Sequence, residues 1–156
     1  MVAPEPIVEA RSLAIAPLRA FALFTTDLSL WWPQAYSWSQ GSLDRIWIDD
    51  HPAGLAREVD QAGLERIWGF VIDCDPPHRL AFRWMIDPDR ALQRDPARAS
   101  LVEIAIARDA DADASRVTLT HGEFDRHPGD TAAYRAGLAA DQGWPYLMDL
   151  LANAAA

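Results

Sequence analysis

His121 is the polar residue best placed to do chemistry. In segment 116–123 apolar and polar side chains alternate, so that Val117, Leu119 and His121 share one face of an expected strand. On an inward face, the imidazole could donate a hydrogen bond to a ligand carbonyl or act as an acid or base. The alternative is a core histidine bonded to a neighbouring backbone group or to Tyr134. Alternation alone leaves both interpretations open.

Two charged residues, Glu58 and Arg83, could face the same interior. A buried Glu58 would need a partner such as Arg83, because an uncompensated buried charge is costly. The single cysteine, Cys74, excludes an intrachain disulfide and makes a poor metal or redox candidate. The remaining histidines are expected in turns or on the surface: His51, His78 and His127.

No familiar catalytic assembly is present in the sequence. It contains no nucleophile elbow, no paired-histidine metal motif and no glycine-rich phosphate loop. We therefore expect no metal and no other cofactor, and we assign no catalytic residue beyond His121 as a weak candidate.

Seven tryptophans are the main apolar feature, and each can bury roughly 150–250 Å². Trp47, Trp68, Trp84 and Trp144 come from three expected strands and a C-terminal helix. Should their inward faces meet, they form an apolar wall with indole N–H donors, which suits a ligand site. The alternative is that they fill a core.

The elements that must position these residues follow from periodicity. Segment 130–151 predicts a long helix capped by Asp130, with a kink or restart at Gly143 and Pro145 and the better-buried half after the kink. Short helical segments are expected at 17–25 and 28–32. Alternation predicts strands at 7–15, 43–50, 55–60, 64–74, 79–86, 101–108 and 116–123.

This order predicts one domain over residues 1–156 with an α+β fold. Strands joined by short turns pair antiparallel, so a single curved sheet should wrap around the long C-terminal helix. The order of elements is one strand, two short helices, six strands and the long helix.

Charge and hydropathy exclude several classes of partner. The net charge is −9 and the chain contains no lysine, so nucleic acid and anionic membranes are not expected partners. No apolar run approaches the roughly 20 residues that span a bilayer, and the first residues lack the pattern of a signal peptide, which favours the cytoplasm. The acidic stretch 109–113 is expected to be a solvated hairpin loop rather than a cation site.

Six short motifs, in order along nearly the whole chain, resemble one family. They are Pro17-Leu18-Arg19-Ala20-Phe21 with Phe24-Thr25, Trp31-Trp32-Pro33, Gly69-Phe70-Val71, Asp75-Pro76-Pro77-His78-Arg79-Leu80 with Phe82-Arg83-Trp84, Arg116-Val117-Thr118-Leu119-Thr120-His121, and Gly143-Trp144 with Leu147. The chain resembles a single-domain bacterial member of the family named for homology to the activator of the ninety-kilodalton heat-shock-protein ATPase. That family lies within the START-like, helix-grip superfamily, also called SRPBCC. One departure is Pro52-Ala53-Gly54-Leu55, where family members often carry a Gly-Gly-Arg turn.

The resemblance implies a helix-grip fold with a cavity between the curved sheet and the long helix, which holds a small hydrophobic molecule such as a lipid. Two alternatives stay open: a co-chaperone that stimulates a chaperone ATPase, and a cyclase or dehydratase that uses His121 in the cavity. The outer face of the first strand or the Trp31-Trp32 turn could also serve as a homodimer contact. The alternative, burial of these residues within one chain, stays open. The side chains expected to line the cavity are Trp47, Glu58, Trp68, Phe70, Phe82, Trp84, His121, Tyr134, Trp144 and Met148.

Overall fold

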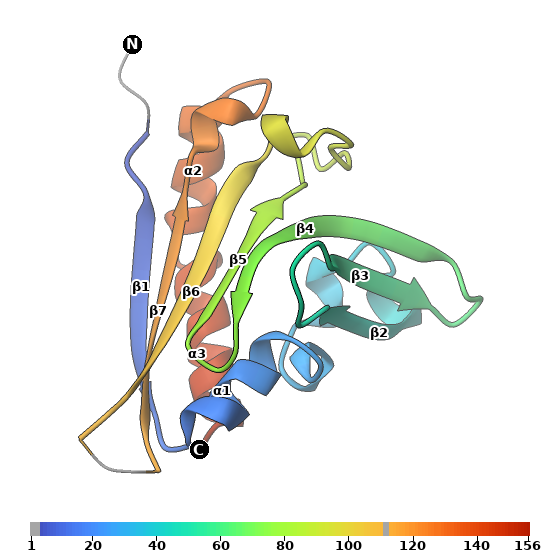
Figure 1. Cartoon of the computed structure of the whole chain (residues 1–156). Coiled ribbons are helices and arrows are strands. Elements are labelled where there is room, and N and C mark those ends of the chain that lie inside the picture. The colour runs from blue at the N-terminus through green and yellow to red at the C-terminus, as the bar shows by residue number, and fades with distance from the viewer. Residues whose placement is uncertain (1–3, 111–112) are drawn as a thin grey trace.

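Seven strands form one antiparallel sheet in the order β1-β7-β6-β5-β4-β3-β2 (Figure 1). The protein is represented by a computed structural model, which describes residues 4–110 and 113–156. The strands are β1 (Ile7–Leu13), β2 (Leu43–Ile48), β3 (Leu55–Asp60), β4 (Glu65–Asp75), β5 (Arg79–Trp84), β6 (Ser100–Arg108) and β7 (Ser115–Gly122). The helices are α1 (Pro17–Phe24), α2 (Thr131–Ala139) and α3 (Trp144–Ala154).

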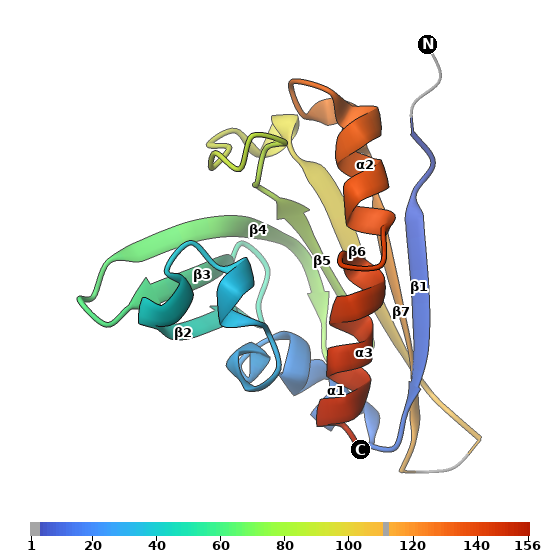
Figure 2. The ribbon, with the colours of Figure 1, turned by 180° about the vertical axis from the view of Figure 1, so that it is seen from behind.

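The curled sheet confirms the predicted α+β helix-grip fold. β4 is the longest strand, and it bends from its pairing with β5 toward the β2–β3 hairpin (Figure 1). Seen from behind, α2 and α3 follow one another along one face of the sheet, beside β1, β6 and β7 (Figure 2). All seven strands lie within two residues of their predicted ends. The expected helix at 28–32 is instead a single 3-10 turn, Leu28–Leu30.

Alternation explains how the sheet buries one face. In β7, Val117, Leu119 and His121 are buried while the side chains between them are partly or fully exposed. In β5, Leu80, Phe82 and Trp84 point into the same interior. Because successive strand side chains point to opposite faces, these positions form one continuous core surface under the helices.

The C-terminal helix restarts rather than kinks. The Asp130 side chain accepts a hydrogen bond from Ala133 N at 3.0 Å, which confirms the predicted N-cap of α2. At Gly143 a Cβ atom would lie 2.1 Å from Leu138 O, so only glycine fits where the chain turns back between the two helices. Pro145 then stands in the first turn of α3, where a missing N–H costs nothing.

The second half of this broken helix is the better buried, as predicted. None of the α2 side chains is fully buried, whereas α3 buries Trp144, Leu147, Met148 and Leu151. α2 therefore has an open flank, and α3 is an integral part of the core.

The Trp31-Trp32 pair packs largely inside the molecule. Trp31 is 6% exposed and donates to Leu23 O, and Trp32 is partly buried against Trp68. Most of the surface of this pair is therefore buried within the chain, and a dimer contact there stays a prediction. Residues 111–112, the middle of the acidic loop between β6 and β7, lie outside the described residues. Within the described ranges, no helix is long and apolar enough to cross a membrane.

Candidate functional site

A cavity of about 260 Å³ lies between the α2–α3 junction and the inner side of the strands β2 to β5. Its walls combine strand residues with three loops and the helices. The lining residues are Trp32, Tyr36, Trp38, Ile46, Glu58, Trp68, Trp84, Ile86, Asp87, Arg90, Tyr134, Gly137, Leu138, Gln142, Gly143 and Leu147.

Three indoles form what we call the aromatic wall: Trp32, Trp68 and Trp84. The Trp32 and Trp68 rings stack with their centroids 5.9 Å apart and their planes at 26°, and Trp84 meets Trp68 edge-on at 5.8 Å. Such contacts add to the stability gained from burying the rings. Within the described residues, the Nε1 atoms of Trp32 and Trp68 are buried without a hydrogen-bond partner. The wall is thus held mainly by ring packing.

The loop that covers the cavity is fixed by one buried carboxylate. Glu58, on β3, accepts hydrogen bonds from Trp38 N at 3.1 Å, Ser39 N at 2.9 Å and Ser39 Oγ at 2.7 Å, and it has no exposed surface. The predicted partnership with Arg83 is wrong, because Arg83 pairs with Glu123 at 3.2 Å. Loop amides and a hydroxyl solvate the carboxylate instead, so a cation is not needed.

Two aromatic side chains of this loop close over the cavity. Tyr36 Oη donates to Gln142 O at 2.8 Å, between α2 and α3. Trp38 Nε1 donates to Arg90 O at 3.3 Å, in the loop that follows β5. The cover is therefore tied to both sides of the opening.

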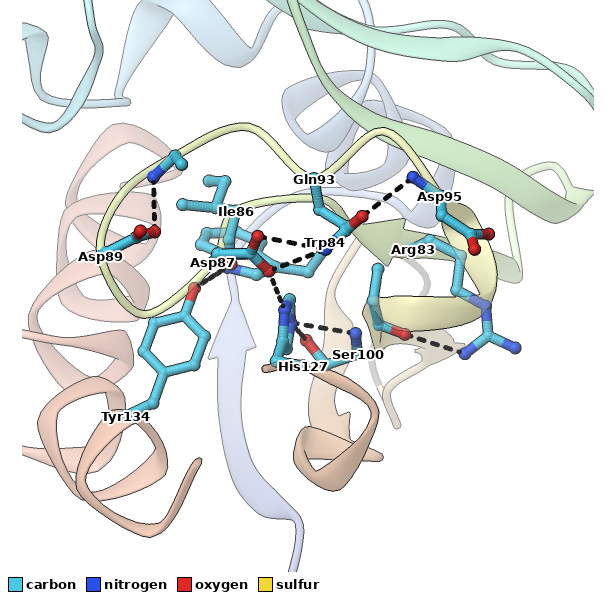
Figure 3. Close-up of polar contacts among 12 residues, drawn as sticks. Arg83, Trp84, Ile86, Asp87, Asp89, Gln93, Asp95, Ser100, His127 and Tyr134 are labelled. Atoms are coloured by element: carbon cyan, nitrogen blue, oxygen red, sulfur yellow. Dashed lines mark hydrogen bonds and ion pairs between the residues drawn. The ribbon is translucent and has the colours of Figure 1, made fainter. Parts of the chain in front are cut away.

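A chain of buried polar groups runs beside the cavity (Figure 3). His127 Nε2 accepts from Ser100 N at 3.0 Å and lies 2.8 Å from Ser100 Oγ. A backbone amide can only donate, so Nε2 carries no proton and the ring's single proton is on Nδ1. His127 Nδ1 then donates to Asp87 Oδ1 at 2.9 Å, and Gln93 Nε2 also donates to this carboxylate.

His121 extends the chain into the core. The indole of Trp144 can only donate, and it donates to His121 Nδ1 at 2.9 Å, so the proton of His121 is on Nε2 and points at Ser100 Oγ, 2.8 Å away. Complete burial, together with His127, holds the pKa of His121 well below its ordinary value. We call the set Trp144, His121, Ser100, His127 and Asp87 the polar chain. Every one of its bonds donates toward Asp87.

Ser100, His127 and Asp87 have the connectivity of a nucleophilic triad, but the serine is not available to a substrate. Ser100 has no exposed surface, it does not line the cavity, and its hydroxyl lies between two imidazoles. A nucleophile must reach the reacting atom. This triad-like set therefore orients side chains, and the group that it presents to the cavity is Asp87.

Tyr134, on α2, joins the cavity to the loop after β5. Its hydroxyl accepts from Trp84 Nε1 at 2.8 Å and donates to Ile86 O at 2.5 Å (Figure 3). Burial raises the pKa of Tyr134, and the charge of the nearby Asp87 acts in the same direction. Tyr134 is thus a neutral, bonded phenol at the cavity wall.

Four of the ten expected lining residues do line the cavity: Glu58, Trp68, Trp84 and Tyr134. Three others, Phe82, Trp144 and Met148, are buried in the core beside it, and His121 lies in the polar chain. His121 is a core histidine, as one of the two interpretations held, but its partners are Trp144 and Ser100 rather than a backbone group or Tyr134.

Trp47 and Phe70 do not line the cavity either. The Arg45 guanidinium lies 4.2 Å from the centroid of the Trp47 ring, and Trp47 Nε1 donates to Asp49 Oδ1 at 3.1 Å. Trp47 lies between the buried Ile46 and Ile48 in β2, so alternation turns it to the other face of the sheet. Phe70 is half-buried on β4, next to the inward-facing Trp68 and Val71 but not in the lining.

Several site residues were not anticipated. Tyr36, Trp38, Asp87 and Arg90 lie outside the strands, and His127, expected in an exposed turn, is 4% exposed. The polar residues of loops carry no periodic signal that would turn them inward. Among the described residues, no cluster of three or more His, Cys, Asp or Glu side chains is arranged to hold a metal ion.

Comparison with known proteins agrees with this fold. A family model described as Activator of Hsp90 ATPase homolog 1-like protein matches residues 19–156. No curated protein matches the sequence. Among solved structures, the anthrahydroquino-gamma-pyrone synthase Txn09, complexed with SUM, is 28% identical with a TM-score of 0.68, and the match covers 97% of each chain.

Two more distant structures share the fold. CalC from Micromonospora echinospora, described as a self-sacrificing resistance protein, is 23% identical with a TM-score of 0.66, covering 96% of this chain and 92% of its own. The AHSA1 protein from Silicibacter pomeroyi is 20% identical with a TM-score of 0.56, covering 95% of each chain.

Proposed function

The chain belongs to the family of Activator of Hsp90 ATPase homolog 1-like proteins, and from this premise we propose that it binds a small apolar molecule in the cavity between its sheet and α2–α3. The observation that carries the proposal is the aromatic wall facing an open volume of about 260 Å³. Ligand sites are typically apolar hollows of roughly 300–1,000 Å³ with a few polar groups. A molecule of two or three fused rings suits a cavity just below that range.

The composition of the lining supports an apolar ligand rather than a polar one. Trp32, Trp68 and Trp84 offer ring faces and edges, and Leu138 and Leu147 add aliphatic surface from the helices. Burying apolar area contributes roughly 25 cal/mol per Å², so a ring system placed here would gain several kcal/mol.

A second candidate is an enzyme that acts on a polycyclic aromatic substrate in the same cavity. What favours it is the similarity to Txn09, described as an anthrahydroquino-gamma-pyrone synthase, at 28% identity. A ligand-binding protein and such an enzyme share the first step, which is uptake of the apolar molecule. The co-chaperone alternative, suggested by the family's description, needs no open cavity.

The test uses Gly137, on α2, which lines the cavity and where an added Cβ meets nothing within 4 Å. Gly137→Phe should place a ring in the opening, and Gly137→Ala is the matched control, which should favour the helix by about 0.5–1 kcal/mol without filling the site. We expect wild type and Gly137→Ala to bind the fluorescent apolar probe N-phenyl-1-naphthylamine. Gly137→Phe should weaken that binding at least about tenfold.

Native mass spectrometry of the gently purified protein provides an independent measurement. A mass that is present in the native state and lost on denaturation would support a bound molecule, and Gly137→Phe should lack it. Equal probe binding by all three proteins, or no binding by any of them, would overturn the proposal. Stimulation of a chaperone ATPase that is equal in Gly137→Phe and wild type would instead favour the co-chaperone alternative.

A further inference from the structure

One acceptor at the cavity wall keeps unused hydrogen-bonding capacity. The Asp87 side chain is 12% exposed, and within the described residues its one ion-pair partner is His127, which the amide of Ser100 keeps neutral. An ionised carboxylate has about four acceptor positions, whereas His127 and Gln93 supply three contacts through two groups. A mostly buried carboxylate with only neutral donors gains from one more donor.

The other side-chain acceptors of the inner wall are less accessible to a ligand. The Glu58 carboxylate takes three bonds from the covering loop and has no exposed surface, whereas the Asp87 side chain is 12% exposed. The Tyr134 hydroxyl both donates to Ile86 O and accepts from Trp84. Asp87 and Tyr134 both line the cavity, and the Tyr134 hydroxyl bonds the carbonyl of Ile86, the residue before Asp87. A bound ligand would therefore meet Asp87 as the acceptor still open to it.

From this arrangement we infer that Asp87 is the polar anchor of the cavity and that the cavity selects flat apolar molecules bearing a phenolic or enolic hydroxyl group. The inference rests on the proposed function and deepens it. The indole surfaces of Trp32, Trp68 and Trp84 that line the cavity favour a planar aromatic body, and Asp87 accepts the hydroxyl hydrogen. The exposed Arg90, which also lines the cavity, disfavours a ligand cation, so a neutral hydroxyl suits the site better than an ammonium group.

The rest of the polar chain acts on Asp87 as a set of positioning residues. Each bond from Trp144 through His121, Ser100 and His127 donates in the same direction, and aligned hydrogen bonds polarise and strengthen one another. The carboxylate is thereby held in one orientation before a ligand arrives. Preorganisation of this kind lowers the cost of binding.

The experiment compares three probes that share a naphthalene body. 2-Naphthol has the hydroxyl donor, 2-methoxynaphthalene replaces it with an ether that cannot donate, and 2-naphthylmethylamine carries a cation. Isothermal titration calorimetry at neutral pH should give 2-naphthol an affinity at least about tenfold above that of 2-methoxynaphthalene, as expected for a hydrogen bond to a charged acceptor. The cation should bind more weakly than 2-naphthol.

Asp87→Asn keeps an oxygen that can accept from His127 but loses the charge. We expect its preference for 2-naphthol over 2-methoxynaphthalene to fall to within about twofold. Asp89→Asn is the matched control, since this neighbouring carboxylate is exposed and does not line the cavity, and it should keep the wild-type preference. The preference is a ratio within one protein, so a change in stability alone does not alter it.

The outcomes separate the two proposals. Equal affinity of wild type for 2-naphthol and 2-methoxynaphthalene overturns the inference about Asp87 while the apolar cavity stands, and this result needs no variant to fold. An unchanged preference in Asp87→Asn, or tightest binding of the cation, overturns it as well. No binding of any probe by wild type overturns the proposed function and, with it, this inference.

Discussion

The aromatic wall and the polar chain lie side by side, and they differ in whether their buried N–H groups have hydrogen-bond partners. In the polar chain, Trp144 donates to His121, and each following polar group also has a partner. In the aromatic wall, the N–H groups of Trp32 and Trp68 are buried without a partner among the described residues. Trp144 is thus fixed by a directional bond, whereas Trp32 and Trp68 are held by ring contacts.

The difference separates a region that specifies one arrangement from a region that can adjust. A fully satisfied buried network rigidifies its surroundings, because any other arrangement leaves polar groups unpaired. Ring packing has several arrangements of similar energy, since T-shaped and offset-stacked pairs are both favourable. We therefore expect the polar chain to carry stability and orientation, and the aromatic wall to tolerate change and to adapt to a ligand.

The largest effect should come from His121→Phe. The new ring would still pack against Phe124, whose centroid is 4.3 Å from that of His121, but Trp144 would lose its acceptor and Ser100 a donor. We expect a loss of about 2–4 kcal/mol in the free energy of unfolding, measured by urea denaturation. In the double variant with Trp144→Phe the orphaned N–H is gone, so the combined loss should be smaller than the sum. A loss below about 1 kcal/mol would contradict the role given to the polar chain.

The second-largest effect should come from acid, which should lower the free energy of unfolding through His121. Because the pKa of buried His121 lies well below 6.5 in the folded state, the unfolded state binds a proton that the folded state does not as the pH falls below that value. The free energy of unfolding should then fall with pH by up to about 1.4 kcal/mol per unit from this one group. Urea denaturation between about pH 6.5 and pH 5 measures the slope. His121→Phe should show a shallower slope, and an unchanged slope would show that other groups cause the acid effect.

The smallest expected effect is the difference in stability loss between substitutions of two tryptophans of the aromatic wall. Trp68→Phe removes an N–H group that has no partner, whereas Trp84→Phe makes the same change in size and also removes the bond to Tyr134. We expect Trp84→Phe to cost about 1 kcal/mol more than Trp68→Phe, because only the former loses a hydrogen bond. Thermal denaturation of the two variants, side by side, measures the difference. Equal losses would show that the bond to Tyr134 contributes nothing to stability.

Much of the fold could be predicted from local patterns. β3 has the predicted ends, and the alternation of Leu80, Phe82 and Trp84 correctly identifies β5. The helix break follows from Gly143 and Pro145, whose backbone restrictions act within a few residues. Such signals survive in a single sequence because the interactions behind them are local in the chain.

The site was predictable only where it lies on regular strands or on the C-terminal helical segment. Trp84 could be assigned to the interior because β5 alternates strongly. Trp68 also lines the cavity, although β4 buries Trp68, Gly69 and Val71 without strict alternation, and Trp47, on β2, faces the other way. The contact between Asp87 and His127 could not be predicted in this way, because the two residues lie 40 positions apart and meet only after the sheet has brought their loops together. A pattern with a period of two or 3.6 residues cannot report a contact of that range.

The order of the sheet also bears on how the chain folds as it is made. β1 precedes the other six strands in this sequence, yet it pairs in the sheet with β7 alone, with Ile7 opposite His121. During synthesis, β1 therefore has no strand partner until β7 has been made. Closing so long a loop has a high entropic cost and makes such contacts form late. We therefore expect the successive hairpins from β2 to β7 to form early, and the docking of β1 beside α3 to be the step that completes the molecule.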